Sequence, residues 1–166
     1  MSSHYAVGWF DPKADNLSQQ QQGKPDLDNE AAIDTMVIKF YYKLLNDDLM
    51  APLFYDVANI DVGEHIPKIA QYWYKMLLGD TRYKRHTMQV HRDVHKQEPL
   101  RGAHHERWLY YFMQTIDADF AGPKAAAAKR LALRFSDNLY RHADDINRLQ
   151  AEQAEKATAC PMARIA

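Results

Sequence analysis

The sequence predicts an all-α protein. Apolar residues recur at the helical period of about 3.6 in several long stretches, and no stretch alternates polar and apolar residues as a strand would. The chain has 166 residues with only 6 glycines and 7 prolines, so helix-breaking residues are few. With 46% hydrophobic residues, it is long enough to bury one core. We expect a helical domain over residues 29–150, a polar, flexible N-terminal extension over residues 1–28, and a C-terminal tail over residues 151–166.

The composition argues against several functional classes. The 21 basic and 22 acidic residues give a formal charge of -1, without the basic field of a nucleic-acid binder or the polybasic helix of a membrane-surface protein. No apolar run reaches the roughly 18 residues of a membrane span, and the first residues lack a signal-peptide pattern. The single cysteine, Cys160, excludes an intramolecular disulfide and favours a reducing compartment. We therefore expect a soluble cytoplasmic protein with no nucleic-acid or membrane partner.

The N-terminal extension is mostly polar. Residues 18–26 are rich in glutamine and bury too little apolar surface to offset the entropy of an ordered chain. Tyr5, Trp9 and Phe10 are the exceptions. These three side chains are compatible with docking on the domain, with docking on a second subunit, and with an exposed aromatic patch.

The first two helices have clear boundaries in the sequence. One begins at Asp28 or Asn29, both favoured N-caps, and ends at the polar cluster that starts with Asn46. The next spans residues 62–78 and ends at Gly79, which suits a C-cap. A turn at Pro52 and a short apolar plug separate the two helices. Their inward faces consist of Ile33, Val37, Phe40, Tyr41 and Leu44, and of His65, Ile69, Tyr72, Trp73, Met76 and Leu77.

Two further helices are expected in the second half of the chain. One has an apolar face from Trp108 to Ile116 and closes before Gly122. The last starts at Pro123 and continues through Leu149. Three helix faces of the domain therefore carry a polar aromatic side chain, namely Tyr41, His65 and Trp108. Each alone is more often an ordinary core residue, but together they can converge on a small polar ligand in a dry pocket.

The stretch over residues 83–108 contains five of the eight histidines. It is poor in the apolar residues that would anchor a long helix, so we expect a single short turn at His91. His86, His104 and His105 are expected at the surface. His91 and His95 would share one face if the helix were intact, and His95 is therefore a rival to His91 as a metal ligand.

The same stretch suggests which metal centre the chain could hold. A non-haem site would require several carboxylates and histidines at fixed helical spacing, and the Glu-x-x-His pattern of di-iron bundles does not occur twice in facing helices. A single imidazole beside a large aromatic pocket suits haem, because the macrocycle supplies four nitrogens. The residues thus favour haem with His91 as the iron ligand.

Four motifs in order resemble the group III, or P, branch of the truncated haemoglobins. They are FYYKLLNDDLMAPLF, EHIPKIAQYWYKMLLG, a tyrosine eight residues before a histidine (Tyr83 to His91), and ERWLYYF. The resemblance covers residues 32–142 and implies a two-over-two helical sandwich around haem b, with a proximal helix of a single turn. The chain departs from the family pattern at YKRHT, which lacks the usual glycine and proline, and in a longer segment between His91 and Trp108.

The resemblance also implies a role for individual residues. His91 would be the proximal iron ligand, while Tyr41, His65 and Trp108 would form the distal pocket. Lys68, one turn beyond His65, matches a position that reaches a haem propionate. The residues implied to line the haem or pack behind it are Phe40, Phe54, Tyr72, Trp73 and Met76.

These expectations lead to a functional hypothesis. Hydrogen-bond donors in the distal pocket would stabilise the partial negative charge of bound dioxygen, which favours tight binding over transport. We expect a haem protein that binds dioxygen, carbon monoxide, nitric oxide and cyanide-type ligands. Nitric oxide dioxygenase or peroxidase-like activity, a reductase partner and a homodimer remain open. The alternatives are a haem-based sensor or ligand store that signals through its terminal extensions, and a metal-free helical interaction module.

Overall fold

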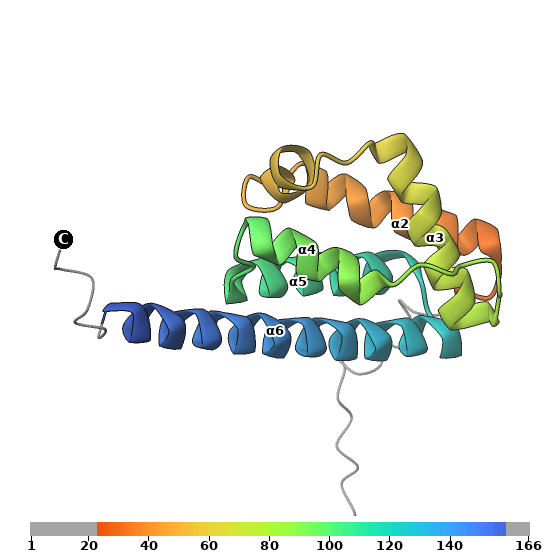
Figure 1. Cartoon of the computed structure of the whole chain (residues 1–166). Coiled ribbons are helices and arrows are strands. Elements are labelled where there is room, and N and C mark those ends of the chain that lie inside the picture. Colours follow the sequence, from red (N-terminus) through yellow and green to blue (C-terminus); the bar gives the residue numbers. More distant parts are fainter. Residues whose placement is uncertain (1–22, 159–166) are drawn as a thin grey trace, which may run out of the picture.

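The computed structural model describes residues 23–158, which fold into helices without a strand (Figure 1). The elements are α2 (Glu30–Leu45), the π-helical turn η1 (Leu53–Val57), α3 (Val62–Leu78), α4 (Thr87–Gln97), α5 (Gly102–Asp119) and α6 (Pro123–Thr158). The prediction of an all-α fold is confirmed. None of the described helices combines the length and the apolar character needed to cross a membrane. Tyr5, Trp9, Phe10 and Cys160 lie outside the described residues.

Local capping explains where α2 and α3 begin and end. The Asn29 side chain accepts a hydrogen bond from the backbone N–H of Ala32, and the Asp61 side chain does the same for Glu64. Gly79 ends α3 in the left-handed conformation, with φ of 76°, which glycine adopts without steric cost. The boundaries expected for these two helices are therefore confirmed.

The helices form two stacked pairs. α2 packs on α3, α5 packs on α6, and α2 also packs on α5, which joins the pairs into the expected two-over-two sandwich (Figure 1). α4 lies against α6 and η1 at one side of this sandwich. Figure 1 also shows α6 running past the ends of α4 and α5. Since α6 continues unbroken to Thr158, the expected boundary at residue 150 does not coincide with a structural break.

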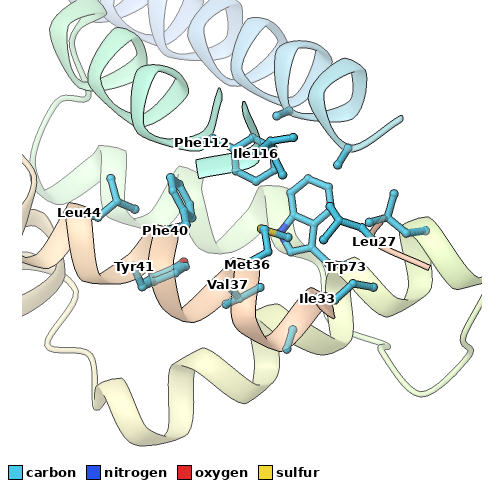
Figure 2. Close-up of a cluster of buried hydrophobic side chains, with 14 of the residues drawn as sticks. Leu27, Ile33, Met36, Val37, Phe40, Tyr41, Leu44, Trp73, Phe112 and Ile116 are labelled. Carbon is cyan, nitrogen blue, oxygen red and sulfur yellow. The ribbon is translucent and has the colours of Figure 1, made fainter. Parts of the chain in front are cut away.

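Stacked aromatic rings occupy the centre of the core. The Phe112 ring lies 5.0 Å from that of Trp73 and 5.5 Å from that of Trp108, and both pairs are stacked. The Phe40 ring meets Phe112 edge-on at 5.2 Å. Figure 2 shows Phe40, Trp73 and Phe112 in one cluster with aliphatic side chains of α2. These rings bring α2, α3 and α5 together around one contact.

A buried carboxylate ties the corner after α2 to α5. Asp47 is 7% exposed and accepts hydrogen bonds from the backbone N–H groups of Leu49 and Met50. It also accepts from the Tyr111 hydroxyl at 2.8 Å and pairs with the Arg107 guanidinium. Burial opposes the charged form, but these hydrogen bonds prevail and hold the pKa of Asp47 below its usual range. Asp47 thereby holds the corner after α2 against Arg107, the residue before Trp108.

The packed domain starts earlier in the chain than residue 29. Leu27 is fully buried, and the Asp26 carboxylate accepts hydrogen bonds from the N–H groups of Lys124 and Ala125 at the start of α6. Gly122 has φ of 134°, and a Cβ there would come within 2.5 Å of the Asp26 side chain. Asp26 therefore serves as the N-cap of α6 from a distant point in the sequence.

We expect Asp26→Ala to lower the free energy of unfolding by about 1–2 kcal/mol, the usual cost of losing an N-cap. Burial would raise the pKa of Asp26, but hydrogen bonds from the Lys124, Ala125 and Leu27 N–H groups hold it below its usual value. A depressed pKa stabilises the fold above the unfolded value of about 3.9 and loses that effect as the pH falls through the folded value.

Urea denaturation of the wild type, Asp26→Ala and Asp56→Ala from pH 7 to pH 3 measures this contribution. Asp56 is exposed and serves as the matched control. The deficit of Asp26→Ala should shrink at the acidic end. Equal stability of the two variants at pH 7 would contradict the capping role.

Candidate functional site

A cavity of about 450 Å³ opens between the helices. Its size falls within the range of about 300–1,000 Å³ that is usual for small-molecule sites. Tyr41 of α2, His65 of α3, His91 of α4 and Trp108 of α5 all line it. The structure thus brings together the four polar side chains that the sequence singled out.

Tyr41 and His65 form a hydrogen-bonded pair inside the cavity. The Tyr41 hydroxyl lies 3.0 Å from His65 Nε2. Burial raises the pKa of the Tyr41 phenol, so it stays protonated at neutral pH. Burial lowers the pKa of His65 to about 4, and the neighbouring His91 imidazole and the cations Arg85 and Lys68 further oppose its protonation. Both groups are therefore neutral at pH 7, and the phenol has one proton to share between His65 and any ligand.

The core fixes the Trp108 ring at the cavity wall. The indole stacks on Phe112 with an interplanar angle of 6° and meets Phe40 edge-on at 5.3 Å. The ring also lies 5.8 Å from that of Phe135 of α6. An indole held on several sides keeps its N–H direction with little loss of entropy when a ligand binds.

The backbone sets the protonation of His91. Its Nδ1 lies 2.8 Å from the carbonyl oxygen of Thr87, one turn earlier in α4. A carbonyl can only accept, so Nδ1 carries the proton and Nε2 keeps its lone pair. The ring packs edge-on against Phe135 at 5.0 Å, and burial lowers the pKa of His91. His91 is thus a neutral imidazole in the tautomer that a metal ligand requires.

The helix that carries His91 is longer than expected. α4 has 11 residues and not a single turn, so that expectation was wrong. The Tyr83 hydroxyl and the Thr87 hydroxyl lie 2.7 Å apart at its start, and the inward face contains Val94 and His95, which is 4% exposed. A buried histidine takes the place of an apolar residue there, and a count of apolar residues misses it.

His95, the rival ligand, is not among the residues that line the cavity. Its Nδ1 accepts a hydrogen bond from the backbone N–H of Leu100 at 3.0 Å. Because an N–H group can only donate, His95 carries its proton on Nε2 and has no free lone pair there. Both observations favour His91 over His95.

Two histidines expected at the surface are buried instead. His104 is 9% exposed and His105 is 8% exposed, and both line the cavity, whereas His86 is exposed as expected. The expectation failed because α5 already begins at Gly102. Residues 104 and 105 then lie four and three positions before Trp108, on the same helix face. That spacing from Trp108 was a signal available in the sequence.

The other residues expected to line the haem or to pack behind it are found in three places: at the cavity wall, behind the wall, and at the protein surface. Phe54 and Lys68 line the cavity, and Lys68 pairs with Glu64 at 3.2 Å. Arg85 also lines it and was not anticipated. Three residues lie behind the wall, with Phe40 and Trp73 in the core and Tyr72 packed between Trp73 and Tyr83. Met76 is 39% exposed and belongs to neither the wall nor the core, so its expected role is corrected.

The arrangement of donors does not suit a bare metal ion. Within residues 23–158, no three or more His, Cys, Asp or Glu side chains are grouped so that they could hold one. His91 therefore offers a single well-placed nitrogen, and a metal held there would need most of its ligands from elsewhere.

The fold is that of a solved truncated haemoglobin. The chain is similar to the group III truncated hemoglobin from Campylobacter jejuni, with a TM-score of 0.65 and 22% sequence identity over 72% of this chain and 94% of that chain. Neither a family model nor a curated protein matches the sequence. The structural likeness establishes a truncated-globin fold.

The buried histidines should make stability depend on pH. The folded pKa of His65, about 4, lies below the unfolded value of about 6.5, and His105 behaves in the same way. The unfolded chain therefore binds more protons between these values, so stability is fully present above about pH 6.5 and decreases as the pH falls towards 4. His65→Gln should flatten this dependence.

Urea denaturation between pH 4 and pH 8 checks this, with His86→Gln as the control at an exposed histidine. If His65→Gln and His86→Gln give parallel curves, His65 is not held neutral by the fold.

Proposed function

We propose that this protein binds haem b in the cavity through His91 and holds dioxygen or a related diatomic ligand beside Tyr41, His65 and Trp108. One observation carries the proposal. The Thr87 carbonyl leaves a lone pair on Nε2 of a cavity-lining histidine, and three hydrogen-bond donors line the same cavity. The fold of the solved truncated haemoglobin supports it.

The residues present fit such a guest. His91 supplies the nitrogen ligand that the macrocycle lacks. Rings such as Phe54 and Phe135 line the wall and suit the apolar faces of a porphyrin. Lys68 and Arg85 line the same cavity and can pair with propionate groups. An apolar body with carboxylates at one edge is therefore complementary to this cavity.

Haem, when bound, supplies an iron at which a diatomic ligand binds and gains partial negative charge. The protein's side chains would stabilise that charge by donating hydrogen bonds to the ligand. The Tyr41 hydroxyl and His65 Nε2 share one hydrogen bond whose direction depends on the His65 tautomer. The Tyr41 hydroxyl can turn to donate to the ligand, and His65 can donate in the tautomer that carries its proton on Nε2. Each hydrogen bond to a charged group contributes about 1.5–3 kcal/mol, so Tyr41 and Trp108 would slow ligand escape.

Absorption spectra of the purified full-length chain test the proposal. Ferric, dithionite-reduced and carbon monoxide-treated samples should show a Soret band that shifts on adding carbon monoxide. A low-spin reduced spectrum would indicate an internal sixth ligand such as His65. Absence of any Soret band, even after haem is added, would refute the proposal and favour the metal-free interaction module.

Tyr41→Phe should speed dioxygen dissociation from the ferrous protein by about tenfold or more, because losing a hydrogen bond to a charged group costs about 1.5–3 kcal/mol and each 1.36 kcal/mol is a factor of ten. It should also raise the autoxidation rate. Stopped-flow displacement of dioxygen by carbon monoxide measures the dissociation rate.

Tyr42→Phe is the matched control, because Tyr42 is the next residue and is 71% exposed. Rates that are the same in Tyr41→Phe and Tyr42→Phe would show that Trp108 or His65 provides the distal hydrogen bond.

A further inference from the structure

The histidines in and near the cavity differ in whether they can ligate a metal. A neutral imidazole binds a metal only through the ring nitrogen that carries no proton. The hydrogen-bond partner of the other nitrogen decides which one that is. Backbone partners give an unambiguous answer, because a carbonyl only accepts and an N–H only donates. The side chains to compare are His65, His91, His95, His104 and His105.

Three of these imidazoles are not available in their present arrangement. His104 accepts a hydrogen bond at Nδ1 from the Arg101 N–H at 2.9 Å, and His95 accepts at Nδ1 from the Leu100 N–H. Both therefore carry the proton on Nε2. His65 already has its Nε2 in the hydrogen bond with Tyr41.

His105 stands apart from these three. Its Nε2 is buried and has no hydrogen-bond partner among the described residues, although the residue is only 8% exposed and lines the cavity. The ring is held edge-on against Tyr140 at 5.5 Å. A buried polar atom without a partner costs free energy that a group entering the cavity can recover. His91 therefore has a free Nε2 lone pair, and His105 has an Nε2 without a partner and no described hydrogen bond that fixes its tautomer, so it can ligate through Nε2 when its proton is on Nδ1.

We propose that His105 is a second imidazole ligand for the iron of the bound haem, which takes the iron when the bond to His91 is broken or absent. The inference rests on the proposed function, since it assumes a haem in the cavity. His91 and His105 come from adjacent helices, α4 and α5, and face one cavity. Sequence spacing alone favours His95 as the rival ligand, whereas the structure favours His105 because His105 lines the cavity and His95 does not.

The electrostatics around His105 agree with this role. Burial lowers its pKa to about 4, and the neighbouring imidazoles of His104, His91 and His95 further oppose its protonation. The imidazole is therefore neutral at physiological pH and need not lose a proton before it ligates iron. With haem bound, His105 would offer the iron a second imidazole and would thereby help to retain the haem if the bond to His91 were lost.

The test uses the full-length chain, labelled with ¹⁵N-histidine and loaded with haem. Resonance Raman spectra of the ferrous form are recorded for the wild type, His91→Ala, and the double variants His91→Ala/His105→Phe and His91→Ala/His95→Phe. We expect an isotope-sensitive iron–histidine band in the wild type and in His91→Ala. The band should be lost with His105→Phe and retained with His95→Phe, where phenylalanine preserves the ring volume.

Either of two spectral results overturns the inference: no such band in His91→Ala, or a band that survives His91→Ala/His105→Phe. Failure of the proposed function looks different, because the wild type itself would then show no carbon monoxide-sensitive Soret band.

A second measurement leaves His91 in place and so does not depend on the folding of His91→Ala. Haem transfer to excess apomyoglobin should be severalfold faster from His105→Phe than from the wild type, because the second ligand can no longer recapture the iron. Equal transfer rates would contradict the inference, and His86→Phe serves as the control at an exposed histidine.

Discussion

The stack of Phe112 between Trp73 and Trp108 is the contact on which the rest of the structure depends. It joins α3 to α5, and the edge of Phe40 adds α2 to the same point. Trp108 is both the last ring of this stack and part of the cavity wall. Because close-packed interiors resist small displacements, core packing sets the position of the Trp108 ring at the cavity wall.

Whether a feature depends on local residues or on distant helices explains how much of the structure the sequence could predict. The ends of α2 and α3 follow from Asn29, Asp61 and Gly79, whose effects are local. Tyr41, His65 and Trp108 were placed in one pocket because polar side chains on apolar faces need a common partner. The burial of His104 and the length of α4 depend instead on backbone N–H groups and on helices packed from elsewhere. The helical spacing of His104 from Trp108 gives part of this information, but the hydrogen-bond partners and the neighbouring helices are not contained in the segment itself.

The charged and neutral groups of the cavity determine which charge distribution a bound molecule can have. The buried Tyr41 phenol and the His65 imidazole are both neutral at pH 7, since burial penalises their charged forms. The cations Lys68 and Arg85 line the same cavity, with Lys68 already paired to Glu64. The carboxylates of Asp61, Glu64 and Asp93 line it as well, and Asp93 pairs with Lys96. Among the described residues, Arg85 is thus a lining cation without an ion pair, and the anionic edge of an otherwise apolar guest can pair with it.

The backbone decides the chemistry of a histidine-rich stretch that composition alone leaves ambiguous. Thr87 offers a carbonyl to His91, whereas Leu100 and Arg101 offer N–H groups to His95 and His104. Identical side chains thus keep the Nε2 lone pair free in His91, whereas His95 and His104 accept at Nδ1 and carry their proton on Nε2. The distinction follows from helix position: a residue inside α4 meets the carbonyl of the preceding turn, while residues near the α4–α5 connection meet the unpaired N–H groups at the start of the next element. Ligand competence is therefore a property of where each histidine lies relative to a helix end.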